Sequence, residues 1–154
     1  MSNIKNAYGT KTTITCTLTS LANAAAREST VIDNTTNLFI DALLRVKTNG
    51  QAGGTGTLEV YAYAALGDTS YTDGATGSDA AFTAANIKNA RLVGIIAMNV
   101  ATAVIAGTMS VAVAFGGVMP DKWGLLFKNN SGAALSATAG DHVIEYEGVY
   151  ATVV

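Results

Sequence analysis

The side chains best suited to nucleophilic catalysis are the single cysteine, Cys16, and the single histidine, His142. A nucleophile needs a base beside it, and no second imidazole exists in the chain. Cys16 alternates with Ile14 and Leu18, a spacing that directs its thiol into a core, where thiols are inert. His142 begins a predicted strand. We therefore expect a buried cysteine and a histidine at a strand edge, not a catalytic pair or an enzyme built on one.

Two carboxylates, Glu145 and Glu147, share one face of the last predicted strand. At a rise of ~3.4 Å per residue they lie about 7 Å apart. Carboxylates that cleave a glycosidic bond stand roughly 5–9.5 Å apart, so the spacing permits a glycoside-cleaving enzyme. Neighbouring carboxylates are also the ordinary composition of a solvent-facing strand. We expect the second interpretation and keep the enzyme as an alternative.

Oxygen-rich and glycine-rich loops are the remaining chemical features. Asp68, Asp73 and Asp79 share one loop and could offer ligands to calcium, but their spacing does not match the EF-hand pattern. The glycines of 50–56 lack the Gly-Lys-Ser/Thr that ends a phosphate loop. We predict no metal and no cofactor.

Composition describes a folded chain with few charges. Charged residues are 13% of the 154, against about 25% in an average globular protein, while hydrophobic residues are 49%. The formal charge is −2, and no run of like charges favours nucleic acid. A charge-poor exterior is typical of surfaces covered by other subunits, so we expect self-association.

The first residues lack the apolar stretch of a secretory signal, which predicts synthesis in a cytoplasm.

The segment 92–120 contains no Asp, Glu, Lys or Arg, and it is long enough to cross a bilayer. It is rich in Val, however, and is interrupted by Gly94, Asn99 and Gly107. Neither flank carries the basic cluster of a topology-determining loop. We predict two buried strands, 92–98 and 109–115, and no membrane partner.

Alternating apolar and polar residues predict about eight strands separated by turn-forming residues. The clearest hairpin joins 38–47 to 58–64 through the glycine-rich loop 49–56. Strand 10–19 presents a row of threonines to solvent, and the chain ends in a strand over 142–153. This pattern predicts an all-β protein, an antiparallel, jelly-roll-like β-sandwich. Residues 1–9 are expected to form a flexible arm and 10–154 a single β-sandwich domain.

Exposed tyrosines are the best candidates for contact with a partner, because Tyr offers much contact area at small entropic cost. Tyr61 and Tyr63 lie on the strand face opposite Leu58, and Tyr71 lies in the long loop. We expect a second sheet to cover Tyr63 and leave Tyr61 and Tyr71 open as contact residues. In the N-terminal arm, Ile4 and Tyr8 are the corresponding candidates.

Several scaffold-like stretches follow one another along nearly the whole chain: 20–22, 27–30, 32–38, 60–63, 115–124, 130–132 and 147–150. Together they resemble small structural proteins of tailed bacteriophages. The resemblance implies a non-enzymatic virion protein, most simply a capsid decoration (cement) protein that clamps neighbouring major-capsid subunits. It also implies a homo-oligomer, with a trimer favoured, located in the virion. The alternative is a tail, fibre or head-fibre module that binds host-surface glycans through Tyr61, Tyr71 and the loop 67–81.

Overall fold

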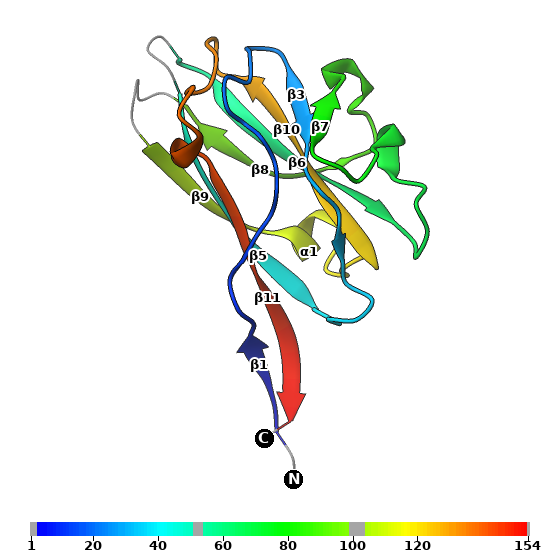
Figure 1. The fold of residues 1–154 in the computed structure, drawn as a ribbon. Helices are drawn as coiled ribbons and strands as arrows, with labels where there is room; N and C mark the ends of the chain where they lie inside the picture. Colours follow the sequence, from blue (N-terminus) through cyan, green and yellow to red (C-terminus); the bar gives the residue numbers. More distant parts are fainter. Residues whose placement is uncertain (1–2, 51–53, 99–103, 154) are drawn as a thin grey trace.

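Two antiparallel sheets face each other in the computed structural model of the chain, which describes residues 3–50, 54–98 and 104–153 (Figure 1). The strands are β1 Ile4–Tyr8, β2 Thr12–Thr13, β3 Ala26–Glu28, β4 Ile32–Asp33, β5 Asp41–Asn49, β6 Thr57–Ala65, β7 Ala80–Phe82, β8 Arg91–Ala97, β9 Val104–Ser110, β10 Lys122–Asn130 and β11 Val143–Val153. The first sheet has the order β1-β11-β5-β9, with β2 also paired to β11. The second has the order β7-β3-β10-β6-β8, with β4 also paired to β10.

Strand pairing follows the jelly-roll pattern. β1 pairs with β11, β3 with β10, β5 with β9, and β6 with β8. The first principal strand thus pairs with the last, the second with the next to last, and so on inward. Eight strands arranged as one long hairpin and folded into two sheets have this connectivity. The predicted all-β, antiparallel, jelly-roll-like sandwich is confirmed.

The predicted hairpin between 38–47 and 58–64 is wrong. Both segments are strands, but β5 lies between β11 and β9 in the first sheet, and β6 lies between β10 and β8 in the second. The connection therefore crosses from one sheet to the other. Local alternation predicts a strand but not its partner, and jelly-roll connectivity separates these neighbours in sequence.

The main core fills the space between the sheets. Alternate residues of β5 and β6 point inward and are fully buried, as the period of two predicts. From β10, Trp123 packs edge-on against Tyr146 of β11, with ring centroids 5.4 Å apart. The largest buried members are Trp123, Phe127, Leu18, Leu44, Leu58, Met98, Leu125, Leu135 and Ile144.

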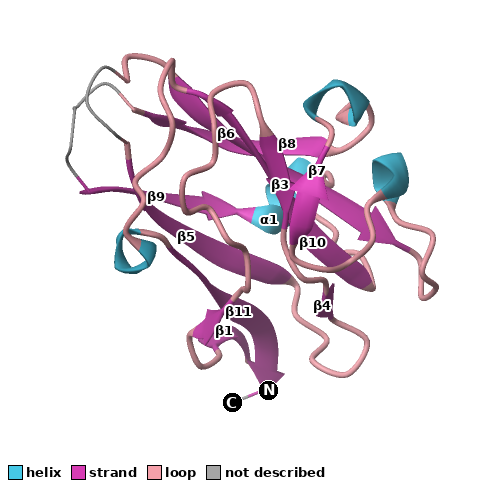
Figure 2. Cartoon of the chain, turned by 45° about the horizontal axis from the view of Figure 1, so that its top comes forward, coloured by secondary structure: helices cyan, strands magenta, loops and turns pink. Residues whose placement is uncertain are grey.

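A second, smaller core lies on the outer face of the second sheet, where the segment 66–90, which includes β7 and is called the loop 66–90 below, folds over β6 and β10 (Figure 2). Tyr63 and Leu126 point away from the main core, yet both are fully buried, together with Ala75 of the loop. Tyr63 is therefore covered as expected, but by this loop and not by the second sheet. The Tyr63 hydroxyl donates a hydrogen bond to the Ser29 carbonyl at 2.8 Å.

The predicted strand 10–19 is mostly loop, and only β2 pairs within it. Ile14 and Leu18 are buried as the alternation predicts. The segment cannot follow one ladder because it passes between the sheets: the Ile14 amide donates to β11, whereas the Thr15 carbonyl accepts from Thr30, beside the second sheet.

Of the two strands predicted in the uncharged segment 92–120, one lies where expected and the other lies earlier in the sequence. Strand 92–98 is confirmed as β8, but 109–115 is wrong because β9 ends at Ser110 and a short helix, α1 (Val111–Ala114), follows. The predicted burial of both strands is also wrong: only Ile96 of β8 and no residue of β9 is buried, because each strand stands at the end of its sheet. The Ser110 side chain accepts from the Val113 amide and caps this helix. Within the described ranges, no helix is long and apolar enough to span a membrane.

The N-terminal segment differs from the expected flexible arm. Residues 4–8 form β1, which is paired along its whole length with the end of β11. The alternating Ile4, Asn6 and Tyr8 lie opposite an equally regular C-terminal strand, and the two ends of the chain complete each other's ladder. The termini thus lie side by side at one end of the molecule (Figure 1).

Candidate functional site

The two terminal strands form a two-stranded ribbon that projects beyond the rest of the sandwich (Figure 1). β5, the neighbour of β11, begins at Asp41 opposite Val149, so residues 150–153 of β11 are flanked only by β1. We call β1 and residues 149–153 the terminal ribbon. A two-stranded sheet has marginal stability in water unless one of its faces is covered.

One face of the terminal ribbon is apolar and exposed. Ile4 lies opposite Val153 and Tyr8 opposite Val149, and directly opposed residues point to the same side of a sheet. The exposed fractions are 75% for Ile4, 68% for Val153 and 58% for Tyr8. Clustered exposed apolar side chains mark contact surfaces on folded proteins. The structure thus places two of the four predicted contact residues, Ile4 and Tyr8, on one surface.

At the base of this ribbon the surface forms a hollow of about 380 Å³. Its apolar lining comes from four separate segments: Tyr8 of β1, Ile40 before β5, Val113 of α1 and Val149 of β11. Ile40 and Val113 are themselves largely exposed. We call this the base hollow. It extends the apolar surface of the ribbon onto the body of the sandwich.

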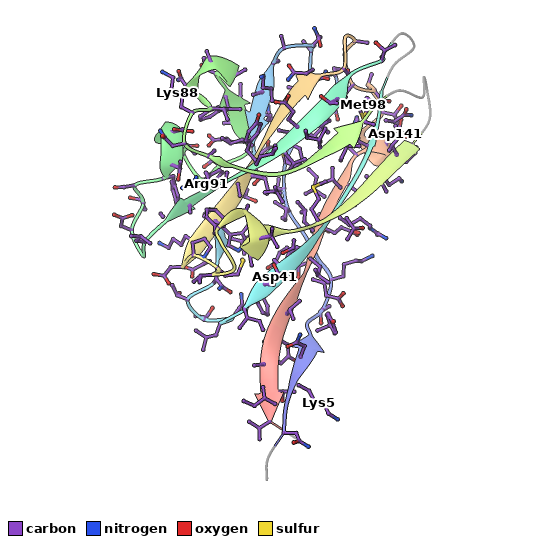
Figure 3. The ribbon with its side chains drawn as sticks, turned by 180° about the vertical axis from the view of Figure 1, so that it is seen from behind. Lys5, Asp41, Lys88, Arg91, Met98 and Asp141 are labelled. Atoms are coloured by element: carbon purple, nitrogen blue, oxygen red, sulfur yellow. The ribbon has the colours of Figure 1, made fainter. Side chains whose placement is uncertain are left out.

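Asp41 fixes the walls of the base hollow. Its carboxylate accepts hydrogen bonds from the Ser110 hydroxyl at 2.7 Å and from the Ala112 amide at 2.9 Å. It also accepts from the amide of Ala42. These bonds join the start of β5 to the end of β9 and to α1, and Figure 3 shows Asp41 beside that helix. The carboxylate is occupied with positioning, so the hollow presents mainly apolar side chains.

A second, smaller hollow of about 200 Å³ adjoins this one on the outer face of the first sheet and contains both predicted carboxylates. Glu145 is largely buried and forms ion pairs with Arg45 and with Lys11, the latter at 3.2 Å. The hydrogen bond from Arg45, with a further contribution from Lys11, lowers the pKa of Glu145. A general acid for glycoside cleavage needs a raised pKa, so Glu145 does not fit that role, and its carboxylate is bound by Arg45 and Lys11.

The other two predicted contact residues lie elsewhere, beside the second core. The Tyr71 ring packs edge-on against Tyr63 with centroids 5.5 Å apart. The Tyr61 hydroxyl donates to Glu59 at 2.7 Å, and burial together with this bond raises the pKa of Tyr61 to about 12. Both rings are half-buried and help to hold the loop 66–90 on the sheet. The structure therefore does not join Tyr61 and Tyr71 to the terminal ribbon.

The aspartates considered as calcium ligands bind groups of the protein itself. Asp73 accepts from the backbone amides of residues 88–90, each at 2.8 Å. Asp79 accepts from Arg27 and Thr17, and Asp68 accepts from the Ser70 amide. In the described residues no group of His, Cys, Asp and Glu is arranged to hold a metal ion. Asp79 thus anchors the loop 66–90 to Arg27 of β3 and to Thr17, and Asp73 joins two parts of the loop to each other.

These anchors make the loop sensitive to acid. Burial opposes ionisation of Asp73 and Asp79, but hydrogen bonds from backbone amides and from Arg27 and Thr17 outweigh it and lower both pKa values from 3.8. A lowered folded-state pKa contributes stability that is present above the unfolded value and lost as pH falls through the folded one. We expect the midpoint temperature of thermal unfolding to decrease when the pH is lowered below about 4, and amide exchange at residues 88–90 to become faster.

The variant Asp73→Asn tests this cause. Its midpoint temperature should be lower than that of the parent at neutral pH and should change less when the pH is lowered. An acid response equal to that of the parent would contradict the role of Asp73.

Cys16 and His142 have separate partners. The Cys16 thiol donates to the Glu28 carbonyl beside the second sheet, and burial raises its pKa. The ring nitrogens of His142 lie 3.0 Å from the Thr48 hydroxyl and 2.9 Å from the Ser136 carbonyl, next to the first sheet. The structure does not bring the two side chains together as a nucleophile and its base.

Sequence reasoning missed Val153, Ile40 and Val113 as surface residues. The signal for Val153 was present, because apolar residues alternate to the very end of β11. No local signal exists for Ile40 and Val113, which follow apolar patterns that predict burial.

Comparison of the chain with protein-family models, with curated proteins and with solved structures finds no match. The functional argument therefore rests on the geometry of the terminal ribbon and base hollow.

Proposed function

We propose that this protein is a non-enzymatic structural component of a bacteriophage particle, a capsid decoration protein that attaches to neighbouring protein subunits. The observation that carries the proposal is the apolar face of the terminal ribbon, with Ile4, Tyr8 and Val153 exposed beside the base hollow. An exposed apolar face of this kind is suited to contact with another protein.

The energetics favour many weak contacts over one strong contact. Burying a Val or Ile side chain contributes roughly 1.5–3 kcal/mol, and a handful of such side chains is exposed here. Association costs an estimated 4–15 kcal/mol of translational and rotational freedom, so the net affinity of one contact is modest. On a regular lattice, repeated weak contacts become strong through multivalency. A decoration protein operates under these conditions.

The fold and the composition support the same proposal. Double-sheet jelly rolls occur in viral capsid proteins and in lectins, although the fold alone does not determine function. Only 13% of the residues are charged, which suits surfaces that are covered in an assembly. The resemblance of seven stretches to phage structural proteins supplies the context.

The proposal predicts that charges on the ribbon face abolish attachment. In Ile4→Lys/Tyr8→Lys, two ammonium groups would have to be desolvated on contact, so we expect at least about ten-fold fewer copies bound to particles that lack the protein. The measurement is co-sedimentation of purified protein with such particles. Leu66→Lys is the matched control, because Leu66 is 85% exposed and lies in the loop on the other sheet; we expect it to bind as the parent does.

Equal attachment by the ribbon variant and the parent would contradict the proposed contact surface.

A second candidate function, a tail or fibre module that binds host-surface glycans, has one favourable observation. Tyr71 lines a hollow of about 360 Å³ together with Asp68, Ser70 and Thr72, a combination of ring and oxygen atoms that suits sugars. Binding to a glycan array without any attachment to particles would favour this candidate instead.

A further inference from the structure

β1 is the end strand of the first sheet, and one of its edges faces away from the molecule. One hydrogen bond shows which residues of β1 direct their backbone groups toward β11: the Gly9 amide donates to the Gly148 carbonyl at 2.8 Å. In an antiparallel pair, every second residue bonds to the partner strand. Lys5 and Ala7, in phase with Gly9, therefore direct their backbone groups toward β11.

The other three residues of β1 direct their backbone groups outward. Ile4, Asn6 and Tyr8 each direct a backbone N–H and C=O along the outer edge, where these groups meet no partner within residues 3–50, 54–98 and 104–153. Their side chains lie on the apolar face of the ribbon. An edge with unpaired backbone groups and apolar neighbours is a template for another strand. Natural edges are commonly protected by proline or by charged side chains, lysine above all; β1 has no proline, and its one charged residue, Lys5, lies on the opposite face from Ile4 and Tyr8.

We propose that a second copy of this chain pairs with this edge, β1 against β1 in antiparallel orientation, about a two-fold axis through Asn6. In this register Ile4 of one copy lies opposite Tyr8 of the other, and Asn6 lies opposite Asn6. These are the residues whose backbone groups point outward, so every free group of the edge finds a partner. Any shift of register leaves some of them unpaired.

The charges and side chains are self-complementary in this register. Lys5 is the one charged residue of β1, and it lies opposite Ala7 of the other copy, so no like charges oppose each other. Figure 3 shows Lys5 directed away from the ribbon. On the apolar face, Ile4 of one copy meets Tyr8 of the other beside the base hollow. Isologous contacts of this kind are the commonest basis of homodimers.

Edge pairing extends the apolar face of the ribbon and does not bury it. Complete burial of a Val or Ile removes roughly 100 Å² from water, so the exposed parts of Ile4, Tyr8, Ile40, Val113 and Val153 amount to on the order of 400 Å² on each copy. The backbone hydrogen bonds of the edge therefore hold the two copies together, and the apolar face stays open to a further partner.

The dimer joins two terminal ribbons into one four-stranded sheet with a continuous apolar face. It is two-fold, unlike the trimer implied by the phage resemblance. It does not depend on the proposed function, because the edge and its register belong to the chain itself. In a decoration protein, this joined face would present two ribbons at once to a shell.

The first test is the solution mass of the full chain across a concentration series, by light scattering. We expect a dimer for the parent and for Asn6→Ala, which keeps the backbone N–H. Asn6→Pro removes one outward N–H without touching a bond to β11, so its dimer dissociation constant should rise at least ten-fold. Circular dichroism and the thermal midpoint check that Asn6→Pro remains folded.

The second test reads the register through cysteine cross-links under mild oxidation. Asn6→Cys should form a disulfide-linked dimer, because the residue faces itself across the axis at a separation that a disulfide can span. Lys5→Cys and Ala7→Cys should each cross-link poorly alone but efficiently when mixed, since they oppose each other. Cys16 provides the background: burial raises its pKa, and the parent chain should give no linked dimer.

Two results would overturn the inference. A monomer at every concentration would show that the edge is not paired in solution. An oligomer whose mass and stability are unaffected by Asn6→Pro, with no cross-link at Asn6→Cys, would place the interface elsewhere. Loss of particle attachment alone would bear on the proposed function and not on the dimer, which the mass and the cross-links measure without any particle.

Discussion

Replacing Trp123 by alanine should lower the free energy of unfolding by about 3–5 kcal/mol, the range for deleting a large buried aromatic side chain. Trp123 is fully buried at the centre of the main core and packs edge-on against Tyr146. Deletion removes contacts with both sheets at once, because β10 and β11 belong to different sheets. Denaturant unfolding followed by circular dichroism measures the change.

Trp123→Phe is the matched variant. The indole Nε1 is buried without a hydrogen-bond partner among the described residues, so loss of that N–H carries no hydrogen-bond cost. Phenylalanine keeps most of the ring contact, and we expect less than half the loss seen with alanine. Equal losses for the two variants would contradict the idea that ring packing, and not a specific indole contact, holds the sheets together.

Replacing Gly124 by alanine should cost about 2–3 kcal/mol, a large effect for one added methyl group. The Tyr63 ring lies directly over Gly124, which is its cross-strand partner, and a Cβ at this position would overlap the ring. The ring would have to move, breaking its hydrogen bond to the Ser29 carbonyl and opening the core under the loop 66–90.

A double-substitution cycle isolates this cause. In a Tyr63→Ala background the added methyl meets no ring, so Gly124→Ala should then cost less than about 0.5 kcal/mol. Gly140→Ala is the matched control in the parent chain, because a Cβ there has open space around it. The cause would be wrong if Gly124→Ala were equally costly with and without the Tyr63 ring.

The sequence predicted the burial of side chains better than it predicted strand partners. The alternation of β5 and β6 correctly places Leu44 and Leu58 in the core, because a strand has a period of two wherever it lies. It assigned the two strands to one hairpin, since nothing local distinguishes a turn from a crossing between sheets. The segment 10–19 fails for the same reason, with Ile14 and Leu18 buried but few ladder bonds formed.

The candidate site could be predicted only in part. The sequence predicts Ile4 and Tyr8 as exposed contact candidates, and both are exposed; their regular alternation is also the signal for β1, in place of the expected flexible arm. Residue type alone favours Tyr61 and Tyr71, but the loop 66–90 half-buries both of them. That cover depends on long-range anchors such as the bonds from Asp79 to Arg27 and Thr17, which no local pattern in the sequence reveals.

The position of this protein in an assembled particle tests the central claim most directly. If the chain is a phage capsid decoration protein, as we propose, a cryo-electron microscopy map of the particle should contain its two-sheet density on the outside of the head, with the strands that carry Ile4 and Val153 against neighbouring protein. A particle whose shell contains no such density, although the protein is produced during infection, would contradict the account.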